Sequence, residues 1–397
     1  MSQTMVASAA EKALIGKVAG TDAVIQVDYD SALRAVDELI RPPETSEFIA
    51  PGFIDVQVNG FAGVDYNDPA ASHDAIAESI RMMFRSGVTR FFPTVITGSE
   101  ERIRGALRNL AAAKNELTRN GMPEAHAIEA FHVEGPHISP ETGPRGAHPV
   151  EHIRRPNFEE FQRWQEAADG GIRLVTVSPE WKETPDYINL LVRSGVVASI
   201  GHTKATAEQI QAAIAAGASM STHLGNAAHS TLPKTQNYIW EQLADDRLAA
   251  SFIVDGIHIP DAFFRAAVRA KGVERCILVT DAVMPAMCSP GPYKLGQVDV
   301  ELRSDGSVVM RGEMRLAGSA LRMDRAIGNT VRLGRVSLRD AIVMATVNPA
   351  RVTRISGRQR GLAPGEKADF VRFTWDEPSS SLTVLETVVS GTTVYSA

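Results

Sequence analysis

The stretch FHVEGPHISP, residues 131–140, ends an apolar run on an ionisable carboxylate, Glu134. A strand end that only reaches water explains an ordinary polar residue here, but a metal ligand explains a carboxylate better. His202 in GHT and His223 in THLGNA also end apolar runs. Catalytic zinc sites take three nitrogen or oxygen ligands and keep one position for water. These residue types therefore predict a metal site, with Asp281 at the end of CILVTD as a neighbouring carboxylate.

The elements that must position these residues repeat eight times after Pro51. Each repeat has a short apolar, β-branched run, a polar break and an amphipathic stretch of helical length. The eight runs are GFIDVQV, TRFFPTVI, AIEAFHV, IRLVTVS, VVASIG, SMSTHL, LAASFIVD and CILVTD. Such alternation favours parallel strands with crossover helices, and eight repeats close a barrel whose active site lies at the carboxyl ends of its strands. A doubly wound open sheet is the alternative, but no glycine-rich phosphate loop follows the first run.

Both ends of the chain carry a different, β-like pattern. Residues 1–50 contain ALIGKV and DAVIQVDY, and residues 361–397 contain ADFVRFTW, LTVLETVVSG and TTVYSA. Neither group is long enough to be stable alone, so we expect the two ends to pair into one small β domain beside the barrel. The predicted parts are residues 1–50 and 356–397 for this small domain and residues 51–355 for the barrel.

Composition and charge restrict the class of protein. The 397 residues carry a net charge of -6 with acids and bases mixed, which argues against a nucleic-acid or membrane surface partner. No basic leader opens the chain, and no apolar run approaches the roughly 18 residues that span a bilayer. The two cysteines, Cys276 and Cys288, agree with a reducing compartment, and Cys276 is expected in the core. We therefore expect a cytoplasmic protein that acts on a small molecule.

The motifs PGFIDVQVNG, HVEGPHISP, GHT, THLGNA, DGIH, LVTDA and LAGS, in this order over residues 51–319, carry a resemblance. Together they resemble the N-acetylglucosamine-6-phosphate deacetylases of the amidohydrolase superfamily, and the likeness continues into VNPAR and GLAPGEKADF. The resemblance implies an α/β fold with a (β/α)8 barrel and a small β-sandwich domain formed from both termini. It also implies a homodimer and hydrolysis of the acetamide of N-acetylglucosamine 6-phosphate, or a close N-acetylhexosamine, to the amino sugar and acetate in amino-sugar catabolism.

The same resemblance implies the roles of the metal-site residues. The metal ligands are Glu134, His202 and His223, and Asp281 is the general acid and base. One divalent ion is expected, foremost Zn²⁺, although such ligands also accept Fe²⁺, Mn²⁺ or Co²⁺. Relatives with two metals have two histidines on the first strand, where this chain has Gln57 and Asn59. Neutral amides bind zinc weakly, so a second metal is not expected there, and both residues are alternatively plain hydrogen-bonding groups.

Further positions are implied as substrate contacts. They are Ala147, His148, Asn226, Ala227, Asp255, His258, Leu316, Ala317 and Gly318. His148 and His258 are also candidates for polarising the acetyl carbonyl, the alternative for each being a sugar contact or a bracing role. His132 shares a strand face with Glu134 and is expected beneath the site.

One segment departs from the family pattern. After THLGNA the deacetylases typically carry an arginine that holds the sugar phosphate, often from the neighbouring subunit, but here no arginine lies between Asn226 and Arg247. Lys234 is the predicted substitute, as a point charge without the guanidinium's bidentate fork. Tyr238 and Trp240 offer faces for stacking on a sugar, or else pack a helix. An unphosphorylated N-acetyl amino sugar, or another N-acyl or cyclic amide, therefore stays open as the substrate.

Overall fold

The structure, a computed structural model, describes residues 12–397, and its largest sheet has eight parallel strands in the order β14-β13-β12-β11-β10-β9-β8-β5. They are β5 (Phe53–Val58), β8 (Val88–Ile96), β9 (Phe131–Glu134), β10 (Ile172–Val177), β11 (Val197–Ile200), β12 (Met220–Ser221), β13 (Ala249–Phe252) and β14 (Cys276–Leu278). A parallel bridge between Val58 and Ala282 joins the two edges. Each predicted apolar run overlaps one strand, so the predicted eight-stranded barrel is confirmed.

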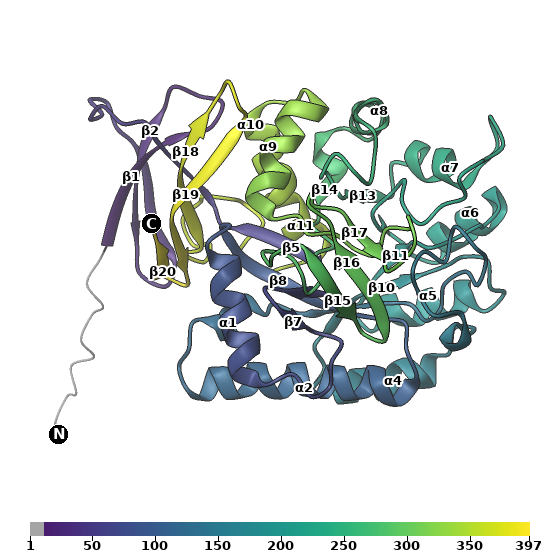
Figure 1. The fold of residues 1–397 in the computed structure, drawn as a ribbon. Coiled ribbons are helices and arrows are strands. Elements are labelled where there is room, and N and C mark those ends of the chain that lie inside the picture. The colour runs from purple at the N-terminus through teal and green to yellow at the C-terminus, as the bar shows by residue number, and fades with distance from the viewer. Residues whose placement is uncertain (1–11) are drawn as a thin grey trace.

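Helices connect the strands and surround the barrel (Figure 1). They are α1 (His73–Phe84), α2 (Glu100–Arg119), α3 (Glu124–Ala127), α4 (Phe158–Ala167), α5 (Thr184–Arg193), α6 (Ala207–Ala215), α7 (Tyr238–Ala244), α8 (Asp261–Lys271), α9 (Met323–Gly334), α10 (Leu338–Ala345) and α11 (Val347–Val352), with 3-10 turns η1 (Val150–His152) and η2 (Val273–Arg275). Several begin at a polar residue that caps a free backbone N–H, and in α6 Thr206 and Gln209 form a reciprocal capping box. Within residues 12–397, no helix is both long and apolar enough to cross a membrane.

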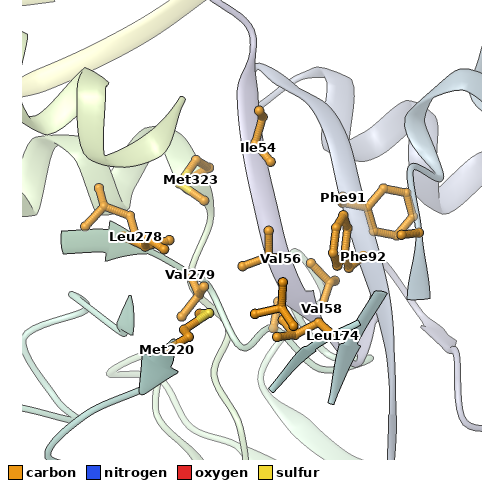
Figure 2. Packing of buried hydrophobic residues seen from close by; sticks show 14 of the residues in the cluster. Ile54, Val56, Val58, Phe91, Phe92, Leu174, Met220, Leu278, Val279 and Met323 are labelled. Atoms are coloured by element: carbon orange, nitrogen blue, oxygen red, sulfur yellow. The ribbon is translucent and has the colours of Figure 1, made fainter. Parts of the chain in front are cut away.

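The barrel core consists of apolar side chains from neighbouring strands. Figure 2 shows Val56 and Val58 of β5 near Phe92 of β8 and Leu174 of β10. All four of these side chains are almost fully removed from solvent. Cys276 at the start of β14 is also completely buried, as expected for a core cysteine. Close packing of this kind holds the strand ends rigid, and these ends carry the polar residues of the site.

A second sheet contains strands from both ends of the chain, in the order β20-β19-β18-β4-β1-β2-β3. The strands are β1 (Lys12–Val18), β2 (Val24–Tyr29), β3 (Leu33–Glu38), β4 (Glu47–Pro51), β18 (Phe370–Asp376), β19 (Ser381–Val389) and β20 (Thr392–Ser396). Strand β4 pairs with β1 in parallel and with β18 antiparallel, and Figure 1 shows the purple and yellow strands side by side. The predicted fold class, a barrel with a small β-sandwich domain from both termini, is confirmed. Residues 1–11 lie outside the described part. The bounds of the three predicted parts, residues 1–50, 51–355 and 356–397, stay predictions.

A buried ion cluster joins the small domain to the barrel. Asp369, just before β18, accepts hydrogen bonds of 2.6 Å from Nε of Arg90 on β8 and from Nη1 of Arg358. Arg358 also donates to the carbonyl oxygen of Gly52 over 2.6 Å. Burial alone would raise the pKa of Asp369, but the two guanidinium groups outweigh it and hold that pKa well below its usual range. The Asp369 carboxylate is thus charged at neutral pH, and Glu129, 3.7 Å from Nη1 of Arg90, supplies a second negative charge to the cluster.

Two short sheets lie outside the eight predicted barrel strands. One pairs β6 (Gly60–Phe61) with β7 (Val64–Asp65), and the other is a meander of β15 (Gly291–Leu295), β16 (Val298–Leu302) and β17 (Val308–Met310). The meander has a small apolar core of its own that includes Val283 and Ala317. Leu295 and Val298 reach the cavity at the carboxyl end of the barrel. The meander therefore forms part of the cavity wall.

Candidate metal and substrate site

Three ionisable side chains meet at the carboxyl ends of the barrel strands. Glu134 is the last residue of β9, His202 follows β11 and His223 follows β12. Oε1 of Glu134 lies 3.2 Å from Nε2 of His202 and 2.9 Å from Nε2 of His223, and the two Nε2 atoms are 3.2 Å apart. All three residues are buried, and their potential ligand atoms lie within 4.8 Å of one another. The structure thus brings together the three residues that the sequence singled out.

The hydrogen bonds around these side chains suit a cation. Nδ1 of His202 lies 3.0 Å from the carbonyl oxygen of Pro144, which fixes the proton on Nδ1 in the neutral ring. The Nε2 lone pair of His202 then faces both the oxygen of Glu134 and the nitrogen of His223. Lone pairs this close repel one another unless a proton or a metal ion lies between them. Two imidazoles and one carboxylate are also a set that catalytic zinc uses, so the residues fit a divalent metal.

Glu134 is charged despite its burial. Burial would raise its pKa, but the hydrogen bonds and charges of His202 and His223 outweigh that effect and hold the pKa well below its usual value. A buried carboxylate with two imidazole partners is a preformed anionic site. Such a site favours a bound cation over an empty cavity.

Asp281 lies beside this cluster and is held by two amides. Nδ2 of Asn59 donates to Oδ1 of Asp281 over 2.6 Å, and Nε2 of Gln57 donates to the same oxygen over 3.2 Å. Gln57 also donates to Oε1 of Glu134 over 2.9 Å. Burial, followed by the charge of Glu134, raises the pKa of Asp281 to about 6. A carboxylate with a pKa near the working pH is suited to accept and return a proton.

Gln57 and Asn59 use their amide nitrogens to bind carboxylates. This is the hydrogen-bonding alternative that the sequence left open for both residues. The side-chain oxygen of Asn59 is buried and has no hydrogen-bond partner within the described chain. It is the one amide oxygen of the pair that is placed to accept a hydrogen bond from a water or a substrate in the cavity, because Asn59 lines that cavity and Gln57 does not.

Three residues of the site have an unusual backbone conformation that directs their side chains. His202, His223 and Asp281 have positive φ values of 49°, 29° and 51°. Residues other than glycine rarely adopt such values, because the Cβ atom then crowds the backbone. Each of these residues lies two or three positions after the end of its strand in the barrel. The turn redirects the side chain toward the shared centre, and strain of this kind is typical of functional sites.

A cavity of ≈ 620 Å³ opens above these residues and is large enough for a sugar. Eight of the predicted contact residues line it: Ala147, His148, Asn226, Ala227, His258, Leu316, Ala317 and Gly318. Gly318 has a φ of 67°, and a Cβ added there would lie 2.3 Å from Cγ1 of Val283. Only glycine fits this position, so the backbone itself forms the wall.

The two predicted catalytic histidines are oriented by fixed partners. Nδ1 of His148 lies 2.7 Å from the Thr97 hydroxyl oxygen, and its ring packs edge-on against His202. Burial, followed by the charge of His202, lowers the pKa of His148 to about 3, so the ring is neutral at pH 7. Nδ1 of His258 lies 2.6 Å from Oδ2 of Asp255. Both rings line the cavity, and Thr97 is an orienting residue that the sequence reasoning missed.

Four other predicted residues lie elsewhere. Asp255 does not line the cavity but holds His258 through its ring and its backbone N–H. Lys234 is exposed and does not line the cavity. Tyr238 is buried at the start of α7 and its hydroxyl accepts from the backbone N–H of His229, while Trp240 is half exposed. Neither aromatic residue lines the cavity, and the buried Tyr238 matches the helix-packing alternative, whereas Trp240 lies outside the apolar core.

His132 lies beneath the site, as its strand position predicted. Its Nε2 is 2.8 Å from the hydroxyl oxygen of Thr176, and its ring is fully buried. Burial lowers the pKa of His132 to about 4, so this ring stays neutral. It supports Glu134 from below without facing the cavity.

Arg315 was not predicted and lines the cavity. It directly precedes Leu316, the first residue of the LAGS motif. The family pattern places the arginine that holds the sugar phosphate after THLGNA, so that pattern does not point to Arg315. A basic residue next to a predicted contact motif was the signal that could have identified it.

Comparisons with known proteins place the chain in a family. The model of the Amidohydrolase family matches residues 48–394. A curated N-acetylglucosamine-6-phosphate deacetylase from Lysinibacillus sphaericus is 31% identical over 350 residues, which cover 88% of this chain and 86% of the relative. A curated N-acetylgalactosamine-6-phosphate deacetylase from Shewanella sp. (strain ANA-3) is 34% identical, with 89% of this chain and 84% of the relative covered.

A solved structure agrees with these relatives. It is a mutant N-acetyl-D-glucosamine-6-phosphate deacetylase from Mycobacterium smegmatis in complex with N-acetyl-D-glucosamine-6-phosphate. Its TM-score with this chain is 0.86 at 29% identity, and the match covers 98% of this chain and 100% of that chain. The chain therefore belongs to the amidohydrolase family and, within it, to the N-acetylglucosamine-6-phosphate deacetylase family.

Proposed function

We propose that this protein is a metal-dependent hydrolase that removes the acetyl group of N-acetylglucosamine 6-phosphate or a close N-acetylhexosamine 6-phosphate. The products are the free amino sugar phosphate and acetate, so the enzyme would act in amino-sugar catabolism. One observation carries the proposal: Glu134, His202 and His223 converge at the floor of a sugar-sized cavity, with Asp281 beside them. The named activities of the relatives support the choice of an acetylated amino sugar.

One divalent ion, foremost Zn²⁺, would be held by Glu134 and the Nε2 atoms of His202 and His223. Fe²⁺, Mn²⁺ or Co²⁺ suit the same ligands. When bound, such an ion polarises the amide carbonyl and lowers the pKa of a water to about 7. A second ion is not proposed, because Gln57 and Asn59 direct their amide N–H groups at the carboxylates.

Asp281 performs both proton transfers in this proposal. As a carboxylate it accepts a proton from the attacking water when the new C–O bond forms at the acetyl carbon. The same proton then passes from Asp281 to the amide nitrogen, the C–N bond breaks, and the amine leaves together with acetate. Asn59 and Gln57 orient the Asp281 carboxylate during both transfers through their hydrogen bonds to Oδ1.

His148 and His258 are the proposed donors to the substrate. Each ring is fixed through Nδ1, by Thr97 and by Asp255, which leaves Nε2 for the cavity. A neutral ring that donates from Nε2 stabilises negative charge on the acetyl oxygen, and a ring that accepts there holds a sugar hydroxyl. Ala147, Asn226, Ala227, Leu316, Ala317 and Gly318 would complete the substrate contacts.

A second candidate substrate is an unphosphorylated N-acetyl amino sugar. The observation that favours it is the position of Lys234, which does not line the cavity and so offers no charge to a phosphate there. Another N-acyl or cyclic amide is less favoured, because the cavity retains the residues that resemble the deacetylase contacts. The proposal also includes a cytoplasmic location and a homodimer.

A substrate panel tests the proposed function. Purified protein loaded with Zn²⁺ is assayed for acetate release from N-acetylglucosamine, N-acetylgalactosamine and the 6-phosphate of each. The proposal expects the highest kcat/KM for one of the phosphorylated sugars. No acetate from any of the four sugars, with stoichiometric metal present, would contradict it.

A further inference from the structure

We propose that Arg315 recognises the phosphate of the substrate, from within the same chain and not from a neighbouring subunit. This inference rests on the proposed deacetylase function and adds the residue that selects phosphorylated sugars. It assigns the anion-binding part of the cavity to the segment between the β15–β17 meander and the LAGS motif.

Among the residues that the structure describes, Arg315 is the one arginine or lysine in the cavity wall. The residues that line the cavity include no lysine and no second arginine within the described chain. Arg315 is partly open, with 39% of its side-chain surface accessible. A ligand in the cavity can therefore reach the guanidinium without displacing packed residues.

Two protein groups already orient this guanidinium. Nε and Nη2 donate to Oε2 of Glu313 over 3.0 Å and 2.6 Å, and Nη1 donates to the carbonyl oxygen of Gly146 over 3.2 Å. Glu313 engages the side edge of the planar group, and Gly146 engages one hydrogen of Nη1. These bonds fix the plane of the side chain, which reduces the entropy lost when a ligand binds.

The remaining donors form a fork. A guanidinium has five N–H groups, one on Nε and two on each terminal nitrogen. Three of them make the bonds above. One N–H on Nη1 and one on Nη2 are left, and this pair is the geometry that binds two phosphate oxygens at once.

The chemical class of the ligand follows from the surroundings. Glu134 and Asp281 line the same cavity as Arg315, and the proposed function puts the reacting amide beside these two carboxylates. A substrate that fills the cavity would then present an uncharged amide to them and a phosphate monoester to Arg315. Ser230 and Thr142 also line the cavity and carry hydroxyl groups.

Arg315 also has a bracing contact, and the test must separate the two roles. Its bond to Gly146 holds the loop that carries Ala147 and His148. Loss of that bond would disturb turnover of every substrate, whereas loss of the phosphate fork would affect only phosphorylated ones. Arg315→Gln keeps an amide donor for Gly146 but removes the charge and the fork, and Arg315→Lys keeps the charge alone.

The experiment measures kcat/KM for N-acetylglucosamine 6-phosphate and for N-acetylglucosamine with each variant. Arg315→Gln is expected to lower the value for the phosphorylated sugar by about ten- to a hundredfold and to change the plain sugar by less than about twofold. The kcat/KM of Arg315→Lys for the phosphorylated sugar should lie between the values of Arg315→Gln and the unaltered protein. The matched control is Arg311→Gln, an exposed arginine of the same segment that does not line the cavity, and it should leave both values unchanged.

Three results would overturn the assignment. If Arg315→Gln lowers kcat/KM equally for both sugars, Arg315 only braces the loop that carries His148. If the variant lowers kcat/KM for neither sugar, Arg315 has no role in recognition. A loss of the phosphate preference in Lys234→Ala, with Arg315→Gln unaffected, would move the anion contact to Lys234.

A binding measurement separates this inference from the proposed function. Calorimetric titration with glucosamine 6-phosphate and glucosamine compares affinities without turnover. If the protein releases no acetate but binds the phosphate tighter in an Arg315-dependent way, the deacetylase proposal fails and the anion site stands. If acetate is released but the preference for the phosphorylated sugar does not depend on Arg315, the deacetylase proposal stands and the assignment of the anion site to Arg315 fails.

Discussion

Asn59 donates a hydrogen bond of 2.6 Å from Nδ2 to Oδ1 of Asp281, across the seam where β5 meets the segment after β14. The bond lowers the pKa of Asp281 against the larger effect of burial. Asn59→Ala removes it, so the pKa of Asp281 should rise. A base works when deprotonated, so the acid limb of the kcat/KM profile should move to higher pH, with about a tenfold loss of kcat at neutral pH.

The control for this prediction is Asn348→Ala, since Asn348 is a buried asparagine whose amide donates to the backbone oxygens of Val273 and Cys276 and not to Asp281 or Asn59. Its acid limb should not move, whatever its effect on stability. An unchanged limb in Asn59→Ala would mean that another group sets the acid side of the profile.

Loss of a metal ligand should empty the site. Glu134→Gln, His202→Ala and His223→Ala each remove one of three ligands, so each should lose stoichiometric metal and nearly all activity. Metal content by plasma mass spectrometry checks the first effect, and acetate release checks the second. His229→Ala, a partly buried histidine that does not line the cavity, should keep both.

Metal removal tests the same site without mutation. Dialysis against a chelator should abolish activity, and one equivalent of Zn²⁺ should restore it, because the three ligands form one site. Full activity in protein shown to be metal-free would reject the metal-dependent mechanism. Restoration that requires two equivalents would point to a second ion.

Asp281→Asn should separate chemistry from metal binding. The amide keeps the size of the side chain but cannot accept the proton, so kcat should fall at least about a hundredfold while metal content stays stoichiometric. Near-normal turnover would place the base elsewhere. Asp299→Asn, on the exposed side of β16, is the control and should match the unaltered enzyme.

The buried Asp369 predicts how stability depends on pH. Its pKa is depressed in the folded protein, so its stabilising contribution is present above the unfolded pKa of about 4 and is lost as pH falls toward the folded value. Asp369→Asn leaves the buried Arg358 without its carboxylate partner and Arg90 with Glu129 alone, so it should cost about 3 to 5 kcal/mol at pH 7. Below about pH 4, the difference in the free energy of unfolding between Asp369→Asn and the unaltered protein should become smaller.

Urea unfolding at pH 7 and at pH 3.5 measures this difference. Asp376→Asn serves as the control, because Asp376 is exposed and bonds only the nearby Ser379 within the described chain. A gap between Asp369→Asn and the unaltered protein that stays constant with pH would show that the carboxylate charge is not what stabilises the cluster.

The barrel and the centre of the site could be predicted because both follow from periodicity. Strands such as β10 and β14 are apolar runs bounded by polar breaks, and parallel strands bring their carboxyl ends to one side. Glu134, His202 and Asp281 each stand at such an end, so their meeting required no knowledge of loops. The sharing of one sheet by strands from both ends was expected because neither end is stable alone, whereas the pairing of β4 with β18 was not predicted.

Other features depend on geometry that a linear pattern does not contain. The direction of the Asn59 amide depends on the seam that closes the barrel, and the cavity position of Arg315 depends on how residues 311–318 leave the meander. The meander itself was readable: KLGQVDV and LRSDGSVVM place Gly296 and Asp305–Gly306 between alternating apolar residues. It was not predicted, because its strands lie outside the eight repeats that form the barrel.

The positive φ values of His202, His223 and Asp281 have a consequence for engineering this enzyme. Each such backbone costs about 1 to 3 kcal/mol, which the surrounding packing offsets. Glycine at these three positions would relieve that cost, but it would also leave the buried Glu134 carboxylate without its imidazole partners and remove the proposed base. The backbone strain is thus tied to the site itself, so stabilising substitutions have to be sought elsewhere in the chain and screened for turnover.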